Sequence, residues 1–489
     1  MASESDELGA VDQLLHRGEA NPRTRSGIMA LELLDVAPDW ERYRTNFENA
    51  SRTILRLRQK VVTPTLPTAP PRWVVDPDFN LDFHVRRVRV PEPGTLRDVF
   101  DLAEVILQSP LDISRPLWSV TLIEGLADGR AAQLLHLSHA VSDGVGSVEM
   151  FAQIYDLERD PAPKPAPPMP IPTDLSANDL MREGINALPG TIAGGVRDAV
   201  TGAIGTVGKV ISNPAGAVSG ILDYATSGNR VMRRAADPSP LLRRRSLSSR
   251  SEAIDMRLSD LHKAAKAAGG SINDAYLAAV CGALRLYHEA LGMPIDTLPM
   301  AVPVNLRSDA DPSGGNRFAG VNLAAPVGTV DPVARIQEIR AQMIQRRDES
   351  AIDMLGSIAP VLSLLPSAVL EAMTGSVIGS DVQASNVPVF QEDTFIAGAK
   401  VLRQYGLGPL PGIAIMVVLV SRSGYVTVTA RYDRASVTKE ALFARCLQAG
   451  FDEVLALAGE PSPRSTPASF IASEAASTSA APATNGSVS

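Results

Sequence analysis

Residues 134–146 read LLHLSHAVSDGVG, and this stretch decides the fold more than any other part of the chain. Its apolar run predicts a strand that leads into a turn carrying His139 and Asp143. Side chains alternate between the two faces of a strand, so His136 and Ser138 share one face while His139 belongs to the other. The two histidines therefore point apart, and we expect no metal ion shared between them.

His139 is the residue of this stretch best suited to acid–base chemistry. A neutral imidazole removes a proton from a hydroxyl near pH 7 and can return it to a leaving group. Asp143 could hydrogen-bond the histidine or pair with an arginine to hold the loop, and Gly144 permits a tight turn. The structural alternative for such a segment is a buried histidine with a local hydrogen bond.

Two mixed α/β patterns extend on either side of this stretch. In the first half the expected strands are 28–34, 83–90, 118–123 and 131–139, and the expected helices are 40–58 and 96–108. In the second half the expected strands are 253–258, 298–304, 413–420 and 426–432, and the expected helices are 261–268, 272–290, 332–347, 358–374 and 438–457.

The composition changes abruptly between and after these patterns. Pro-Ala-Pro repeats at 159–172 favour extended chain, and a Ser/Ala/Pro/Thr-rich tail cannot bury enough apolar surface to order itself. The predicted organisation is a first domain at 1–158, a linker with connecting helices at 159–250, a second domain at 251–459 and a disordered tail at 460–489.

Composition also excludes several classes of protein. The chain holds 46 basic and 54 acidic residues, which argues against a broad nucleic-acid-binding surface, and only 4% aromatic residues, which argues against base-stacking platforms. Cys281 and Cys446 supply neither a disulfide framework nor a four-ligand metal site, and we expect buried thiols in a reducing compartment. Without a secretory signal or an apolar run of ~18 residues, the expected location is the cytoplasm.

An arginine-rich stretch departs from this acidic background. Residues 229–250 contain seven arginines and one acid, a local balance of +6 in a chain of formal charge −8. One interpretation is a solvated linker. The other is a docking surface for phosphates or anionic lipid headgroups. The arginines are Arg230, Arg233, Arg234, Arg243, Arg244, Arg245 and Arg250.

The segment around His139 resembles the H-H-x-x-x-D-G motif of the wax ester synthase/diacylglycerol acyltransferase (WS/DGAT) family. This family belongs to the CoA-dependent HxxxD acyltransferase superfamily, with chloramphenicol acetyltransferase and peptide-synthetase condensation domains. Four further blocks are similar to the family in the same order along the chain. They are Pro116-Leu117-Trp118, Ser271-Ile272-Asn273-Asp274, residues 302–307 (VPVNLR) and Ser385-Asn386-Val387-Pro388.

The resemblance implies two chloramphenicol-acetyltransferase-like α/β domains with an active-site channel between them. It implies that His139 is the general base and that Asp143 supports the site structurally. Ser138 stands where the family has its first histidine. The substrate-binding residues that the resemblance implies are Ser138, Gly144, Pro116, Leu117, Trp118, Asn273, Asp274, Ser385 and Asn386.

The accessory blocks also have simpler structural interpretations. Asn273 reads as a helix N-cap, because Asn accepts hydrogen bonds from first-turn amides. The segment from Pro116 to Trp118 reads as the start of a strand with a buried tryptophan. Ser385 and Asn386 precede Pro388 in what the sequence indicates is a loop, where they would form a turn.

The resemblance implies an acyl-CoA-dependent O-acyltransferase that makes triacylglycerol or wax esters from diacylglycerol or a fatty alcohol. Acyl-CoA is then a co-substrate, and no cofactor, metal or nucleic acid is expected. Peripheral association with the inner membrane or with lipid droplets is an open expectation. Two alternatives remain: a related acyltransferase with another hydroxyl or amine acceptor, and a catalytically impaired lipid-binding protein that lost activity with Ser138.

Overall fold

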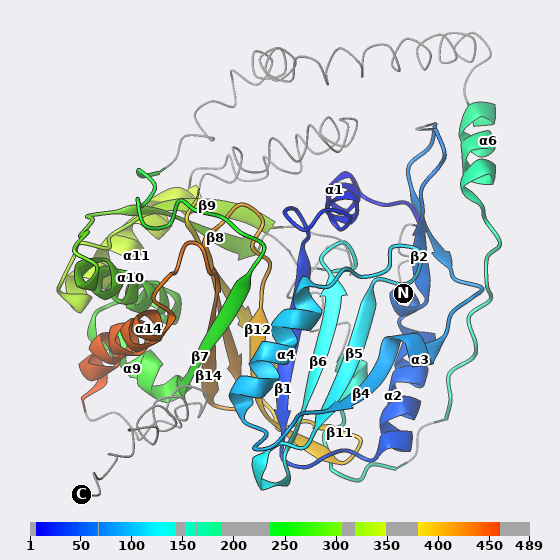
Figure 1. Ribbon diagram of the computed structural model, residues 1–489, viewed down its shortest axis with the longest axis horizontal. Coiled ribbons are helices and arrows are strands. Elements are labelled where there is room, and N and C mark those ends of the chain that lie inside the picture. The colour runs from blue at the N-terminus through cyan, green and yellow to red at the C-terminus, as the bar shows by residue number, and fades with distance from the viewer. Residues whose placement is uncertain are drawn as a thin grey trace, which may run out of the picture.

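A computed structural model describes residues 6–66, 68–142, 152–162, 165–187, 235–305, 318–348 and 380–459. Two six-stranded sheets stand side by side, each with its own helices (Figure 1). This mixed α/β architecture of two units confirms the predicted fold class. Among the described residues, no helix combines the length and apolar character needed to cross a bilayer.

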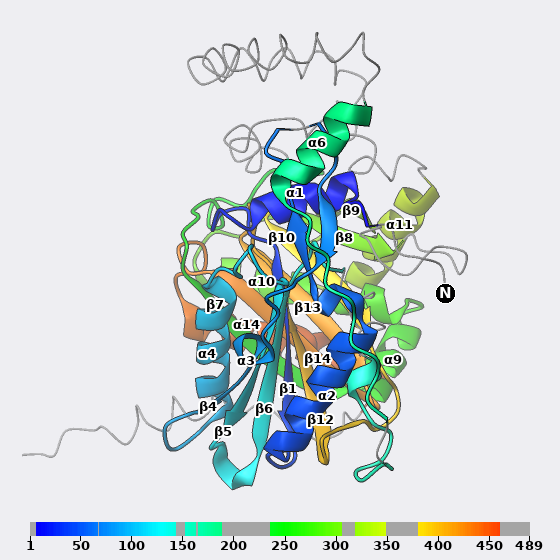
Figure 2. The same ribbon diagram turned by 90° about the vertical axis from the view of Figure 1, so that its right-hand side faces the viewer.

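The first sheet holds the strand that ends at the predicted site. Its strand order is β11 (Phe395–Ile396), β12 (Ala399–Leu407), β1 (Gly27–Leu34), β6 (Ala131–Ser138), β5 (Trp118–Glu124) and β4 (Val85–Arg89). Helices α2 (Trp40–Thr53) and α4 (Leu96–Gln108) cover opposite faces (Figure 2). Smaller elements complete this unit: α1 (Ala10–Gly18), α3 (Leu81–His84), α6 (Ala177–Ala187), β2 (Gln59–Val62) and β3 (Arg72–Val75).

Among the described residues, the helices of the second sheet lie on one of its faces. Its strand order is β7 (Ser249–Arg257), β14 (Tyr425–Asp433), β13 (Ile415–Arg422), β10 (Val382–Pro388), β8 (Leu298–Asn305) and β9 (Phe318–Ala325). The helices that build its core are α9 (Leu258–Ala267), α10 (Ile272–Ala290), α11 (Pro332–Asp348) and α14 (Glu440–Leu455). Cys281 and Cys446 are buried free thiols in this core, as predicted.

A chain crossover joins the two units. β11 and β12 come from the second half of the sequence but complete the first sheet, where β12 pairs with β1. Gly406 of β12 makes this approach possible, because a Cβ there would lie 2.7 Å from Cγ1 of Val418 on β13. The face of the second sheet opposite these described helices therefore packs against the first unit.

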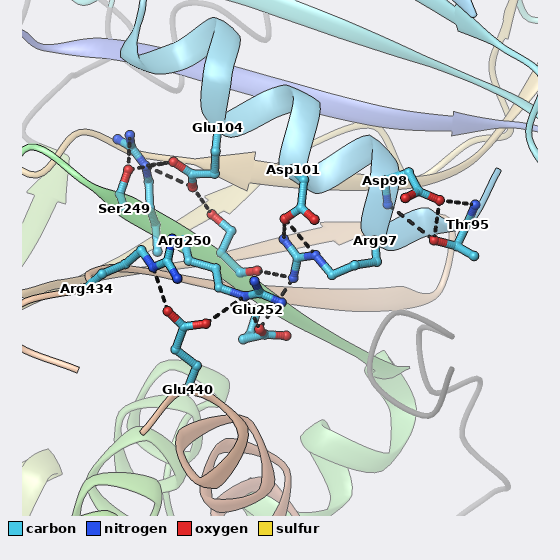
Figure 3. A network of polar contacts seen from close by, with 12 residues as sticks. Thr95, Arg97, Asp98, Asp101, Glu104, Ser249, Arg250, Glu252, Arg434 and Glu440 are labelled. Atoms are coloured by element: carbon cyan, nitrogen blue, oxygen red, sulfur yellow. Dashed lines mark hydrogen bonds and ion pairs between the residues drawn. The ribbon is translucent and has the colours of Figure 1, made fainter. Parts of the chain in front are cut away.

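Helix α4 adds a polar connection between the units (Figure 3). The carboxylate of Glu104 lies 3.2 Å from the Arg431 guanidinium on β14 and accepts a hydrogen bond from Ser249 on β7. Closer to the start of the helix, Arg97 donates to the carbonyl of Ser251 at 2.8 Å. Glu104 and Arg431 are both buried, so this contact lies inside the molecule.

The sequence prediction was most accurate for helices that begin with a capping box. α4 and α10 have the predicted bounds, and each begins with a capping box: Thr95 with Asp98, and Ser271 with Asp274. The predicted strand at 83–90 begins instead as the short helix α3, because the Asn80 side chain caps its first turn. The predicted helix at 40–58 ends at Thr53, where the backbone becomes extended.

The predicted linker contains no helix or strand before α6 among its described residues, but it lies against the first unit. The carbonyl of Pro167 accepts a hydrogen bond from Arg52, and the amide of Thr173 donates to Val75. The helix predicted at 358–374 and the tail at 460–489 lie outside the described residues. The predicted domain boundaries remain predictions. The sequence did not predict that β11 and β12, from the second half of the chain, complete the first sheet.

Candidate active site

The turn that carries His139 is held by backbone and side-chain hydrogen bonds on both sides. The amide of Ser138 donates to the carbonyl of Leu117 at 3.0 Å, and the amide of Val141 donates to the Ser138 carbonyl at 3.0 Å. The Ser138 hydroxyl accepts from the amide of Ala140 at 3.2 Å, bridging the histidine. His139 itself is half-buried, immediately after the end of β6.

Ser138, at the position of the family's first histidine, has a buried carboxyl as its partner. Its hydroxyl donates to Oε1 of Glu19 at 2.7 Å, and Ser26 donates to the same oxygen at 3.2 Å. Burial raises the pKa of Glu19, an effect that these hydrogen bonds and the nearby charge of Arg25 oppose. Sequence reasoning missed Glu19, which lies 119 positions before Ser138.

His136 lies on the opposite face of β6 from Leu135 and Leu137, as the alternation predicts. Leu135 and Leu137 belong to the core under α2, whereas Met29, which pairs with His136, belongs to the core under α4. Burial lowers the pKa of His136 to about 3, and nearby arginines add to this effect. The imidazole is therefore neutral and buried.

The Pro116-Leu117-Trp118 block lies beside the histidine turn. All three residues are buried, and Leu117 provides the carbonyl that the Ser138 amide contacts. The Trp118 ring stacks on His84 with centroids 4.7 Å apart, and its indole N–H donates to the carbonyl of Leu57 at 2.8 Å. Trp118 is thus a fully enclosed core residue at the start of β5.

The Asn273-Asp274 block begins α10 in the second unit. Asp274 is the third residue of the helix and completes its capping box with Ser271. Its carboxylate also lies 3.3 Å from Arg340 on α11. Asn273 is half-buried as the second residue of the helix. The N-cap residue is Ser271, so the predicted N-cap role of Asn273 was wrong.

Ser385 and Asn386 lie in a strand, so the predicted loop was wrong. They belong to β10, which pairs in parallel with β13, and Pro388 is the last residue of that strand. Ser385 shares a strand face with Val387, which packs against the apolar side of the second sheet that faces the first unit. Asn386 is exposed. Asp143 and Gly144 lie outside the described residues.

A cleft of about 480 Å³ lies between the two units and reaches the strand beside the histidine turn. Gly27, which lines it, pairs with Ser138 across β1 and β6. Four arginines and one aspartate line the walls, so the cleft is cationic. They are Arg23, Arg25, Arg245, Arg431 and Asp433.

The arginine-rich stretch divides into two groups in the structure. Arg245 and Arg250 are engaged: Arg245 donates to the carbonyl of Gly412 and lies 3.9 Å from Asp381, while Arg250 pairs with Glu252. Arg243 and Arg244 are exposed. The three arginines before residue 235 lie outside the described residues.

Comparisons with known proteins agree with this arrangement. Residues 3–276 match the model of the wax ester synthase/diacylglycerol acyltransferase catalytic domain, and residues 314–454 match the WS/DGAT C-terminal domain. A Mycobacterium tuberculosis protein, named provisionally as a diacylglycerol O-acyltransferase, is 75% identical over 466 residues, 95% of each chain.

Solved structures show the same fold. The wax ester synthase/diacylglycerol acyltransferase of Marinobacter aquaeolei VT8 matches with a TM-score of 0.61 and 20% identity, covering 93% of this chain and all of that one. A starter condensation domain of rhizomide synthetase, solved with C8-CoA, matches with a TM-score of 0.56 and 12% identity over 94% and 95% of the two chains.

The two-sheet fold and these matches define an acyltransferase. More narrowly, the chain belongs to the wax ester synthase/diacylglycerol acyltransferase family.

Proposed function

We propose that this enzyme transfers an acyl group from acyl-CoA to the hydroxyl of diacylglycerol or of a long-chain alcohol, with His139 as general base. The imidazole removes the hydroxyl proton as the oxygen attacks the thioester carbonyl. The C–S bond then breaks, and the CoA sulfur leaves with the proton that the histidine held. The products are triacylglycerol or a wax ester and free CoA, and no covalent acyl-enzyme is required.

The observation that supports this proposal best is the cationic cleft beside the histidine turn. Gly27 lines the cleft and pairs with Ser138, the residue immediately before His139. With the CoA phosphates held by the arginines of the cleft, the thioester would extend from the cleft around the end of β6 toward His139. The acceptor and product are lipids, so we also propose peripheral association with a membrane or lipid droplet.

A turnover assay with a panel of acceptors tests the proposed reaction. Purified protein receives palmitoyl-CoA with dioleoylglycerol, hexadecanol, a short alcohol or a long-chain amine, and both ester and free CoA are measured. We expect the lipid hydroxyls to be preferred. Preference for the short alcohol or the amine would support the alternative acceptor class, and no turnover with any acceptor would support a lipid-binding protein.

The cleft arginines provide a second test. Arg23 is exposed at the cleft wall, whereas Arg245 and Arg431 already donate to protein groups. We expect Arg23→Ala to raise the KM for acyl-CoA several-fold, since an ion pair at an exposed position contributes up to ~1 kcal/mol. The double variant Arg243→Ala/Arg244→Ala should keep that KM. If instead only the double variant changes, and it loses binding to anionic liposomes, the arginine-rich stretch meets lipid and not CoA.

A further inference from the structure

Glu19 occupies an unusual position for a carboxyl group. It is the C-cap residue that follows α1, and its side chain is almost fully buried against the first sheet. Oε1 accepts hydrogen bonds from Ser138 and Ser26, but Oε2 has no hydrogen-bond partner. Burying a carboxyl with an unsatisfied oxygen costs stability, and an apolar side chain would fill the same space at lower cost.

The hydrogen bonds of Ser138 connect this carboxyl to the histidine turn. A hydroxyl has one proton to donate, and here it goes to Glu19, which leaves the oxygen to accept from the amide of Ala140. His139 lies in the chain between Ser138, whose hydroxyl makes both hydrogen bonds, and Ala140, whose amide donates one of them. The orientation of the Ser138 hydroxyl, and with it the turn, therefore depends on an acceptor at position 19.

The backbone around Glu19 is itself held firmly. Its carbonyl accepts from Nε of Arg25 at 3.2 Å, and a second nitrogen of Arg25 donates to the carbonyl of Gln108 at the end of α4 at 2.6 Å. The acceptor is thus fixed with respect to both β1 and α4.

We propose that Glu19 is a positioning residue for the acyl transfer, holding the His139 turn through the Ser138 hydroxyl. This inference rests on the proposed role of His139. Ser138 is then part of a serine–carboxylate pair that supports the turn in place of the family's first histidine, and its presence does not mark a loss of activity.

Four variants separate positioning from packing. Glu19→Met fills a similar volume without an acceptor, and Ser138→Ala removes the donor. Glu19→Gln keeps an amide oxygen that can accept the same hydrogen bond, and so is the conservative rescue. Ser26→Ala is the matched control, because it removes the other hydrogen bond to the same carboxylate oxygen and leaves the Ser138 link intact.

We expect Glu19→Met and Ser138→Ala each to lower kcat ~10–100-fold with little change in the KM for palmitoyl-CoA, because slight misplacement of a catalytic group is costly. The double variant should be no slower than either single variant, since both break one link. Glu19→Gln and Ser26→Ala should keep kcat close to wild type. Additive losses, or an equal loss in Ser26→Ala, would overturn the proposal.

A measurement that does not need turnover completes the test. The rate at which diethyl pyrocarbonate modifies His139, read by peptide mass spectrometry, should rise in Glu19→Met and Ser138→Ala but not in Ser26→Ala. If wild type proves inactive with every acceptor, the proposed function fails, and this rate still decides the positioning role. Unchanged modification in Glu19→Met and Ser138→Ala would contradict it.

Discussion

Among single residues, Trp118 is the one whose surroundings decide between two interpretations of the sequence. The resemblance suggested that its block shapes a substrate pocket, whereas the simpler expectation was a buried residue at the start of a strand. Trp118 is fully enclosed between His84 and Phe47 and is not among the residues that line the interdomain cleft. The structure favours a role in the core of the first unit.

Trp118→Phe should therefore reduce stability and leave substrate affinity unchanged. Phenylalanine keeps the stacking but removes the N–H that donates to the carbonyl of Leu57. An unsatisfied buried acceptor costs about 1–3 kcal/mol, which urea unfolding would detect. A raised KM for acyl-CoA or acceptor with unchanged stability would instead return Trp118 to the substrate pocket.

The sequence pointed to His139 as a candidate base but not to Glu19, which contacts the turn through Ser138. A histidine at the end of an apolar strand is a local pattern, whereas Glu19 is a single acid after a short helix and meets Ser138 only through folding. Asn386 and Ser385 were misassigned because residues 382–388 (VQASNVP) lack strand alternation, and the proline suggested a turn. The catalytic role of His139 and the support by Asp143 remain predictions.

At the scale of elements, α4 has two functions. One face packs on the first sheet, and the other carries charged groups that contact β7 and β14 of the second unit. Its last residues, Leu107 and Gln108, line the cleft. The helix thus determines both how the units meet and the shape of the proposed CoA site.

Removing the buried carboxylate from α4 should weaken this interface. Glu104→Ala leaves the Arg431 guanidinium buried without its counter-ion, which costs ~3–5 kcal/mol in comparable cases. Asp101→Ala is the matched control on the same helix: Asp101 pairs with Arg97 but is half-exposed, so its loss should cost no more than ~1 kcal/mol. Equal urea stabilities for the two variants would show that the Glu104 contact does not hold the units together.

Helices and strands that depend on neighbouring residues were predicted accurately, whereas those that depend on pairing with distant segments were not. Capping boxes and apolar periodicity are local, so α4 and α10 were predicted to the residue. β12 joins the first sheet through pairing with β1, some 370 positions earlier in the chain, and no local pattern carries that information. β10 depends on parallel neighbours in the same way.

At the scale of the whole molecule, the first unit carries several neutral buried histidines. Burial lowers the pKa of His16 and His84 to about 4 and that of His136 to about 3. Each pKa is below the ordinary value of 6.5, so the unfolded chain binds more protons than the folded one between these limits. Their contribution to stability is complete above pH 6.5 and is lost as the pH falls toward 4.

The free energy of unfolding should therefore decrease on acidification, by up to about 1.4 kcal/mol per pH unit for each such histidine. Urea unfolding at several values between pH 7 and pH 5 measures the slope. His84→Gln should make this slope shallower, because it removes one group that binds a proton in the unfolded chain but not in the folded protein. A slope unaffected by His84→Gln would show that this imidazole already titrates normally in the folded state.

Activity of His139→Ala tests the central claim most directly. The variant and wild type are compared under the same conditions with palmitoyl-CoA and the preferred acceptor, with unfolding curves to confirm that the fold is retained. Loss of a general base should lower kcat ~10²–10⁴-fold while both proteins unfold at the same urea concentration. A kcat within a few-fold of wild type in a folded variant would contradict the mechanism and remove His139 from it.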